Sequence, residues 1–423
     1  MYNFNDLFNF DRQQAAIFLV DTVKSGELKL MHPTKSIVTY CRQSSRYRKA
    51  NILLFSDENL QNQWYLVQIY NLVDGYICDE DVFNPLGAGE LSELHKILQD
   101  TNNLFDLKSA NTKVDGFLFS QERPYHYIYD QFVSYFYLSE IDNIVQYAFT
   151  DKLCFYRELP DNKELLTANQ NGCYLFPCTK GSIYNDKSAN SMHHFIRSNS
   201  AKIESKSSLT LWVGITAQKR SWLEQTDGLC NIAIELSKHY SSITVLVDGW
   251  TSLAGGIPDS IKDIARDNAV FDAISTKLSS HDKVELVNLI GKDYKYKVGY
   301  ALSADAYIAN SGAGSMVPLM FASKKGVLHS NGQLYTFENA YDQRTILVPK
   351  NKIYSEKKSK DSGIYSIDWK VIYNLLANSL GIDEKLTEVT GHRSKHYFNI
   401  KKFIFKKSIQ IETFLKKVKS KIS

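Results

Sequence analysis

A turn rich in glycine and serine is the segment of this 423-residue sequence best suited to hold a ligand. Residues 306–309 (Ala-Tyr-Ile-Ala) predict a buried strand, and Asn-Ser-Gly-Ala-Gly-Ser follows directly, ahead of a predicted helix over 315–322. Small residues let the backbone approach a ligand, and the first amides of a helix suit a phosphate. The segment matches neither the dinucleotide fingerprint nor the P-loop. We expect the phosphate contacts from Ser311, Gly312, Ala313, Gly314 and Ser315, with Asn310 as a substrate contact. The alternative is an ordinary tight turn capped by Ser315.

A pair of basic residues follows the predicted strand 209–215. Arg220 can grip phosphate oxygens through two parallel hydrogen bonds, and Lys219 can add a point charge. Together with the glycine turn, they would stabilise the charge that develops on a diphosphate leaving group. The alternative is a solvated Lys-Arg pair on a surface loop. Asp248, at the end of the predicted strand 243–248, is a further expected substrate contact.

A histidine is the candidate general base. His126 follows the predicted strand 116–119 closely, and an imidazole in that place can take the proton of an acceptor hydroxyl. Arg123 and Tyr125 are expected to bind substrate. A hydrogen-bonded structural histidine is the alternative reading.

Two carboxylates favour a different chemistry. Asp79 and Asp81 form a D-x-D arrangement after the predicted strand 75–78, which could hold Mg²⁺ or Mn²⁺ against a nucleotide diphosphate. An acidic turn explains the same residues. The isolated histidines and six scattered cysteines lack the spacing of metal ligands, so we expect no bound metal and no cofactor.

The second half of the chain shows a regular strand and helix alternation. Its apolar runs predict parallel strands joined by helices, as in a doubly wound domain. The predicted strands are 209–215, 243–248, 284–290, 306–309 and 325–329, and the predicted helices are 226–239, 258–268, 270–279, 294–303 and 315–322.

The first half is predicted to follow a similar rhythm. Strands are predicted at 51–55, 75–78, 116–119 and 143–149, and helices at 60–72, 91–98 and 127–138. A polar stretch over 180–208 separates the halves. We therefore predict an α/β protein with two Rossmann-like lobes, over 1–200 and 201–392, a deep interdomain cleft, and a basic helical tail over 393–423.

Charge and composition restrict the class of protein. The chain is 43% hydrophobic and 23% charged, as in ordinary globular proteins. It has no apolar run of the roughly 20 residues that span a bilayer, and its first residues lack the basic region of a secretory signal. We expect a cytoplasmic protein.

The net charge of +4 is unevenly distributed. Residues 393–423 carry ten Lys and Arg against Glu412 alone, a net charge of +9, which leaves −5 for residues 1–392. Apolar residues recur among these lysines at spacings of three and four, as in an amphipathic helix. The tail is predicted either to bind the anionic inner face of the cytoplasmic membrane or to pack on the body. No motif for binding nucleic acid accompanies it.

On these residues the chain resembles the GT-B glycosyltransferases. Within residues 209–335 the segments 286–291, 304–315 and 326–328 resemble the donor lobe of bacterial heptosyltransferases and, more distantly, of O-fucosyltransferase-like enzymes. The sequence has Asn310 where an acidic residue is usual, and it lacks the histidine that normally follows, which leaves the donor sugar open.

The resemblance implies transfer of a sugar from a nucleotide diphosphate sugar to a saccharide or lipid-linked acceptor in bacterial surface polysaccharide or glycoconjugate synthesis. It also implies that the lobe over 1–200 binds the acceptor and that the lobe over 201–392 binds the nucleotide sugar. We expect a metal-independent, inverting enzyme that acts in the cytoplasm or at the inner face of the membrane. Two alternatives remain open: a metal-dependent glycosyltransferase that uses Asp79 and Asp81, and a non-catalytic GT-B-like binding or assembly protein.

Overall fold

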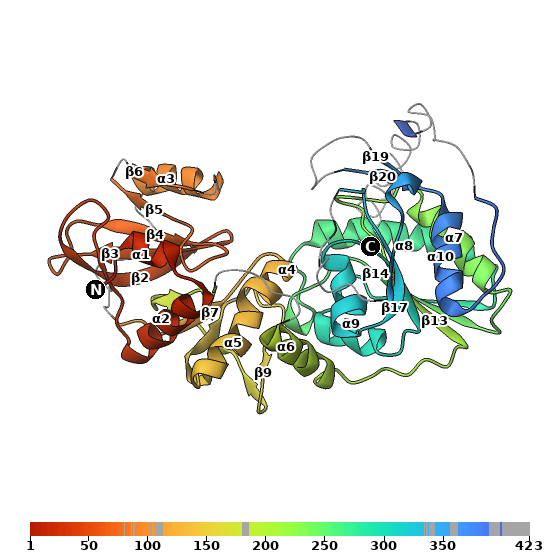
Figure 1. The fold of residues 1–423 in the computed structure, drawn as a ribbon, viewed down its shortest axis with the longest axis horizontal. Coiled ribbons are helices and arrows are strands. Elements are labelled where there is room, and N and C mark those ends of the chain that lie inside the picture. Colours follow the sequence, from red (N-terminus) through yellow and green to blue (C-terminus); the bar gives the residue numbers. More distant parts are fainter. Residues whose placement is uncertain are drawn as a thin grey trace, which may run out of the picture. The chain divides into compact units, whose positions relative to one another are not determined.

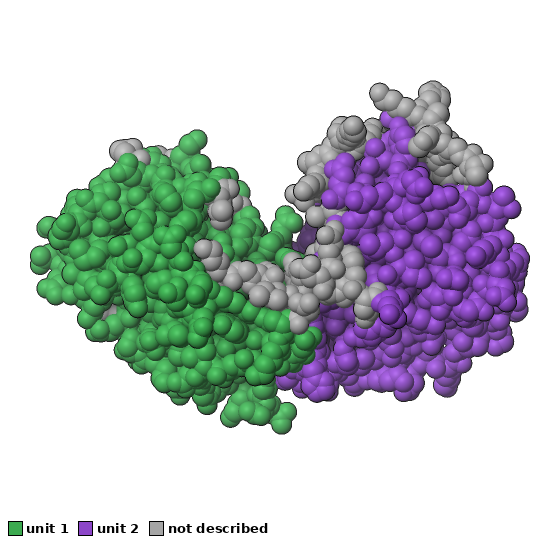
Figure 2. All heavy atoms as spheres, in the orientation of Figure 1, with its two compact units in different colours: residues 1–192 green, residues 193–423 purple. Residues whose placement is uncertain are grey.

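The protein forms two compact units, Met1–Met192 and His193–Ser423 (Figure 2). The computed structural model describes residues 1–79, 81–85, 87, 89–101, 104–105, 113–179, 186–333, 335, 337, 343–355, 363–388 and 398–399. The basic tail predicted over 393–423 therefore lies outside the described residues, apart from residues 398 and 399.

Unit 2 is built on a six-stranded parallel sheet in the order β15-β14-β13-β16-β17-β18 (Figure 1). The strands are β13 (Leu209–Gly214), β14 (Ile243–Asp248), β15 (Val284–Asn288), β16 (Ala306–Asn310), β17 (Lys325–His329) and β18 (Thr345–Leu347). The helices are α7 (Gln225–Leu236), α8 (Ile261–Leu278), α9 (Tyr294–Ala301) and α10 (Trp369–Leu380), and a small hairpin joins β19 (Ile353–Ser355) to β20 (Tyr365–Ile367). This order is that of a doubly wound α/β sheet. The α/β prediction for the second half is confirmed, although 258–268 and 270–279 form one helix, α8.

The sheet of unit 2 forms because its central strands are apolar on both faces. Every residue of β13, β14 and β16 is buried. On one face, side chains such as Val213 and Val245 pack with α7, α8 and α10 in one hydrophobic core. The alternate residues, Trp212 and Tyr307 among them, point to the opposite face. Right-handed crossovers place α9 and the helix Met316–Phe321, which contact each other, on that face.

Unit 1 contains two main sheets. The first is antiparallel in the order β1-β2-β3-β4-β5-β6, and the second is parallel in the order β11-β8-β7-β12. The strands of the first are β1 (Lys29–Met31), β2 (Val38–Tyr47), β3 (Ala50–Ser56), β4 (Trp64–Gln68), β5 (Gly75–Cys78) and β6 (Asp81–Phe83). Those of the second are β7 (Gly116–Phe119), β8 (Ala148–Thr150), β11 (Leu166–Thr167) and β12 (Tyr174–Leu175), and β9 (Glu158–Leu159) pairs with β10 (Lys163–Glu164). The helices are α1 (Phe4–Asn9), α2 (Arg12–Ser25), α3 (Gly89–Thr101), α4 (Pro124–His126) and α5 (Val133–Ile141). The boundary between the two units falls inside α6 (Lys187–Ser198).

The parallel arrangement predicted for the whole first half is wrong for residues 29–83. The helix predicted over 60–72 is a loop followed by β4, because Asp57 accepts hydrogen bonds from the amides of Asn59 and Gln61 and bends the chain there. The connections from β2 to β6 are short turns, whereas a parallel pair needs a crossover of about a dozen residues. Connections as short as these can join neighbouring strands only when the strands are antiparallel.

Candidate functional site

The parallel sheet of unit 2 has a topological switch point between β13 and β16. These two strands are neighbours, and the chain leaves them toward opposite edges of the sheet. In open α/β sheets, ligands bind in the crevice outside the carboxyl ends of such strands. The two loops that begin there carry the basic pair and the glycine turn predicted from the sequence.

The glycine turn adopts a backbone that only glycine tolerates. Gly312 has φ +132° and ψ −156°. The Ser311 amide donates to the His329 carbonyl at 2.7 Å, and the amide and hydroxyl of Ser315 both donate to the Gly312 carbonyl, at 3.1 and 2.9 Å. Ser315 is fully buried, so its hydroxyl closes the turn instead of facing a ligand. The amides of two of the five predicted phosphate contacts, Ser311 and Ser315, are thus hydrogen-bonded within the protein.

Three amides of the turn are left to bind a ligand. Those of Gly312, Ala313 and Gly314 have no hydrogen-bond acceptor among the residues that the structure describes. Ala313 is exposed, and the Asn310 side-chain oxygen lies 2.8 Å from the place a Cβ on Gly314 would take. Asn310 is therefore a support beneath the turn, 8% exposed.

The helix predicted over 315–322 differs from the expectation. It consists of a 3-10 turn over Ala313–Ser315 and one π-helical segment over Met316–Phe321. Pro318 has no amide hydrogen to give, which weakens a regular α-helical ladder here. The aligned dipole of a long α-helix is therefore missing, and an anion would be held by the amides and the nearby cations.

Arg220 lies against this turn. Its Nη2 atom is 2.9 Å from the position that a Cβ on Gly312 would occupy, so the guanidinium packs where Gly312 has no side chain. Arg220 is half-buried, and its φ of 52° is left-handed. Lys219, next to it, is exposed and makes no ion pair within the described part of the chain. The structure thus brings Arg220 and the glycine turn together from loops about ninety residues apart.

The loop that carries Arg220 is fixed at its start. The Gln225 side chain accepts from the Thr216 amide at 3.2 Å and donates to the Thr216 carbonyl at 3.1 Å. The Ala217 amide donates to Asp267 Oδ1 at 3.0 Å. The first residues after β13 therefore have one defined conformation.

The loop is also fixed where it ends. Tyr365 of β20 donates its amide to the Ser221 carbonyl at 3.1 Å and accepts from the Leu223 amide at 2.9 Å. The buried Trp222 indole donates to the Ile367 carbonyl at 3.0 Å. Hydrogen bonds therefore hold the loop on both sides of Arg220.

A neutral histidine and a tyrosine form a buried pair next to this loop. The Tyr365 hydroxyl and His329 Nδ1 are 2.6 Å apart. Burial lowers the pKa of His329 to about 3, so the imidazole is uncharged. Burial also raises the pKa of Tyr365, and the positive charge of Arg220 works against that rise. The guanidinium is thus the positive charge that acts on this pair.

Asp248, predicted as a substrate contact, is used differently. Its carboxylate pairs with Lys297 Nζ at 2.5 Å, and the two side chains are 4% and 0% exposed. Lys297 also donates to the carbonyls of Gly249 and Trp250. Asp267 completes the cluster by accepting the Trp250 amide at 2.8 Å, and burial raises its pKa to about 7. Asp248 therefore holds the loop after β14 in place.

In unit 1, His126 is part of a pair that the sequence did not reveal. His126 Nδ1 lies 2.6 Å from Asp130 Oδ2, one turn further along, and the side chains are 27% and 8% exposed. The Tyr70 ring packs on the imidazole at 4.5 Å. Asp130 lies in the π-helical segment Tyr127–Phe132, and such segments are frequent at functional sites. The i, i+4 spacing of the two residues was the available signal.

Of the other sequence candidates of unit 1, Tyr125 contacts this pair. Tyr125 packs edge-on against His126 at 5.2 Å. Arg123 is exposed at the N-cap of α4. Asp79 and Asp81 flank the tight turn between β5 and β6, and both are exposed. No group of three or more His, Cys, Asp or Glu suited to a metal occurs among the described residues.

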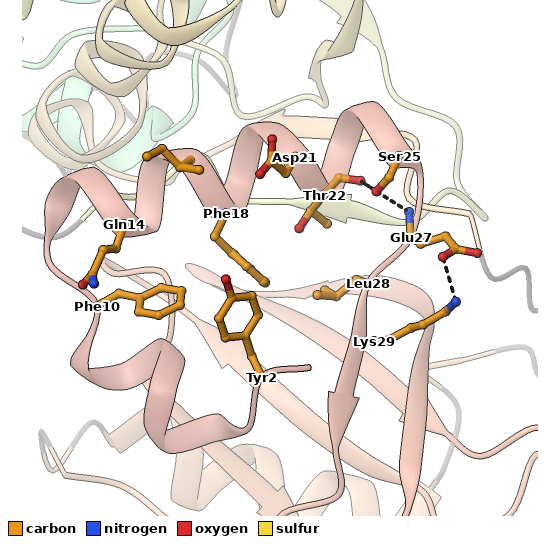
Figure 3. A pocket seen from close by; sticks show the side chains of 11 residues that line it. Tyr2, Phe10, Gln14, Phe18, Asp21, Thr22, Ser25, Glu27, Leu28 and Lys29 are labelled. Carbon is orange, nitrogen blue, oxygen red and sulfur yellow. Dashed lines mark hydrogen bonds and ion pairs between the residues drawn. The ribbon is translucent and has the colours of Figure 1, made fainter.

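Unit 1 also has a surface pocket of about 500 Å³ beside α2. Figure 3 shows the rings of Tyr2, Phe10 and Phe18 gathered in it, with Asp21 above them on α2. None of the residues predicted from the sequence lines this pocket.

Comparison with known proteins adds little to this geometry. No family model and no curated protein matches the sequence. A crystal structure of a mutant of S. aureus TarM, in complex with fondaparinux, alpha-GlcNAc-glycerol and UDP, aligns with 78% of this chain and 74% of that chain, at 8% identity and a TM-score of 0.21. Such a low TM-score supports no conclusion about fold or function. Within the described ranges, no helix is both long and apolar enough to cross a membrane.

Proposed function

We propose that this protein is a glycosyltransferase that moves a sugar from a nucleotide diphosphate sugar to a saccharide or lipid-linked acceptor. The observation that carries the proposal is the contact of the Arg220 guanidinium with Gly312, beside three amides that have no acceptor in the described structure. These groups lie at the switch point of a parallel sheet, where nucleotides bind in proteins of this architecture.

In this proposal the glycine turn and the basic pair bind the leaving diphosphate. The amides of residues 312–314 donate to phosphate oxygens, Arg220 adds two parallel charge-assisted hydrogen bonds, and Lys219 adds charge. Because both ends of the Arg220 loop are fixed, these donors are preorganised for the charge that develops as the sugar–phosphate bond breaks. The reaction then needs no metal ion.

His126 is the proposed general base. Its Nδ1 hydrogen points to Asp130, which leaves Nε2 to take the proton of the acceptor hydroxyl. The deprotonated oxygen attacks the anomeric carbon while the bond to the diphosphate breaks on the opposite face, so the configuration inverts. Asp130 orients the ring and stabilises the imidazolium that forms. Arg123 and Tyr125 are proposed to contact the acceptor.

Thermal-shift measurements with UDP, GDP, ADP, CMP and their sugars, with and without EDTA, test the proposal. We expect one nucleoside diphosphate and its sugar to raise Tm, equally in EDTA. Arg220→Ala and Lys219→Ala should weaken this ligand at least about tenfold, since a charge-assisted hydrogen bond contributes about 1.5–3 kcal/mol. Lys206→Ala is the matched control, because Lys206 is exposed ahead of the amino end of β13.

The same panel separates the alternatives. A shift that disappears in EDTA would favour the metal-dependent enzyme that uses Asp79 and Asp81. The absence of any shift would favour the non-catalytic binding or assembly protein.

We also propose that the tail, residues 393–423, brings the enzyme to the anionic inner face of the cytoplasmic membrane, where surface polysaccharide is assembled. Its net charge of +9 supports this. The full chain should sediment with vesicles rich in anionic lipid at low salt, and a chain ending at residue 392 should not. Equal sedimentation of both would refute membrane binding by the tail.

A further inference from the structure

Two cysteine thiols from distant parts of the sequence meet inside unit 1. The sulfur of Cys41, in β2, lies 3.2 Å from the sulfur of Cys173, which immediately precedes β12. The two residues are 0% and 2% exposed. They lie where the antiparallel sheet meets the parallel sheet, and 131 residues separate them along the chain.

Hydrogen bonds from β2 and β3 connect these strands to the residues beside Cys173. The Ser44 hydroxyl donates to the Gly172 carbonyl at 3.2 Å and accepts from the Tyr174 amide at 2.9 Å. The Asn51 amide group donates to the Tyr174 carbonyl at 2.9 Å. The residues on both sides of Cys173 are therefore tied to β2 and β3, and the two sulfurs remain in contact.

We propose that Cys41 and Cys173 form an intramolecular disulfide that joins the two sheets of unit 1. A disulfide bond is about 2.05 Å long, so the sulfurs need to approach by only about 1 Å. The oxidant is a low-molecular-weight disulfide such as oxidised glutathione, so the bond forms where the thiol pool around the chain is oxidised, and in a reducing cytoplasm the pair stays as two thiols. One cysteine thiolate attacks it and releases one small thiol; the second cysteine displaces the other, so that two protein thiols are oxidised and one small disulfide is reduced to two thiols.

The burial of the pair decides when the bond forms. The contact with Cys41 and burial hold the pKa of Cys173 well above its ordinary value, so little thiolate exists in the folded chain. Thiol–disulfide exchange should therefore be slow in the native protein and fast during folding, before the two sheets pack together.

The other cysteines have different surroundings. Cys154 contacts the Tyr127 hydroxyl at 3.2 Å, Cys78 contacts His32 Nε2 at 3.6 Å, and Cys230 belongs to unit 2. Cys178 is close to Cys173 in sequence, but it packs with Leu118, Tyr174 and Phe176 in a hydrophobic cluster that includes neither Cys41 nor Cys173. We therefore expect a single disulfide, between Cys41 and Cys173.

The test is to refold the full chain in a glutathione buffer, denature it, label free thiols with N-ethylmaleimide and measure the intact mass. Four of the six cysteines should be labelled after oxidising refolding, and all six after reduction. A non-reducing digest should contain the peptide pair that joins Cys41 to Cys173, a result that needs no variant. Tm should fall by about 10 °C on reduction, because the bond closes a long loop in the unfolded chain.

Variants separate this pair from the others. After oxidising refolding, all five remaining cysteines of Cys173→Ser should be labelled, and its Tm should no longer change on reduction. Cys178→Ser is the matched buried control: three of its five cysteines should be labelled, and its Tm should still fall on reduction. Six labelled cysteines in the oxidised wild-type chain, or a digest that links any other pair, would overturn the proposal.

Discussion

Replacing Gly312 with alanine displaces Arg220 without removing its charge. The added Cβ would lie 2.9 Å from Arg220 Nη2, closer than the ~3.5 Å of an ordinary contact, so the guanidinium must move. The φ of +132° is also one that alanine rarely adopts, and the strain should cost about 1–3 kcal/mol of folding stability.

The expected effect on binding follows from the hydrogen bonds that Arg220 loses. A charge-assisted hydrogen bond contributes about 1.5–3 kcal/mol, so Gly312→Ala should weaken a nucleoside diphosphate about 10- to 150-fold in isothermal titration calorimetry. In an Arg220→Ala background the same substitution should have much less effect, because no guanidinium remains to be displaced. The two substitutions should therefore be strongly non-additive.

Gly381→Ala is the matched control for strain. Gly381 ends α10 with φ +76°, and a Cβ there would meet nothing within 4 Å. This variant should lose about 1 kcal/mol of stability and keep wild-type affinity. If a folded Gly312→Ala protein binds the diphosphate as the wild type does, or if its effect adds fully to that of Arg220→Ala, Arg220 does not act through this turn.

Four further substitutions test the other titratable groups. His126→Ala should abolish sugar transfer while donor affinity stays unchanged, and Asp130→Asn should slow transfer by about 10- to 100-fold, also at unchanged donor affinity. The control is His194→Ala, because His194 is exposed. A fully active His126→Ala enzyme would exclude His126 as the general base. The pKa of His329 falls from 6.5 to about 3 on folding, so the free energy of unfolding is highest above pH 6.5 and decreases as the pH drops. Between pH 6.5 and 4 this residue should account for a decrease of about 3 kcal/mol, measured by urea unfolding. The decrease should be smaller by that amount in His329→Gln. The pKa of Asp267 rises from 3.8 to about 7, so its contribution to stability is present below pH 3.8 and is lost as the pH rises through 7. Relative to the wild type, Asp267→Asn should therefore gain about 3 kcal/mol of stability between pH 4 and 7. An unchanged pH dependence of stability in the His329 or the Asp267 variant would refute the assignment for that residue.

The sequence predicted the second half of the fold well because its strands are buried on both faces. The runs 243–248 and 325–329 are centred on the apolar residues Val245 to Val247 and Val327 to Leu328, and they coincide with β14 and β17. In the first half, the periodicity of 60–72 suggested a helix, but this segment contains a loop and the strand β4. The hydrogen bonds of Asp57 form the loop, and the short connection at Asp79 makes β5 and β6 antiparallel. Short apolar segments do not by themselves separate a strand from a helix.

The candidate site was only partly predictable for a different reason. Loops at the carboxyl ends of parallel strands must share one edge, so the approach of Arg220 to the glycine turn follows from topology. The contacts that fix those loops come from side chains with no sequence signal, such as Gln225 and Asp267. The buried pair of Asp248 and Lys297 was likewise invisible, because a carboxylate at a strand end looks the same whether it binds a ligand or a lysine.

Hydrogen exchange of the glycine turn measures the central proposal most directly. The full chain would be exchanged with and without the nucleoside diphosphate that the thermal-shift panel selects, and amide protection would be read by mass spectrometry. We predict that the ligand slows exchange at residues 312–314, whose amides lack acceptors within the described structure, and in the loop 216–221, whose arginine lies against them. Unchanged exchange in both segments at a saturating concentration of ligand would contradict a diphosphate site at this edge of the sheet.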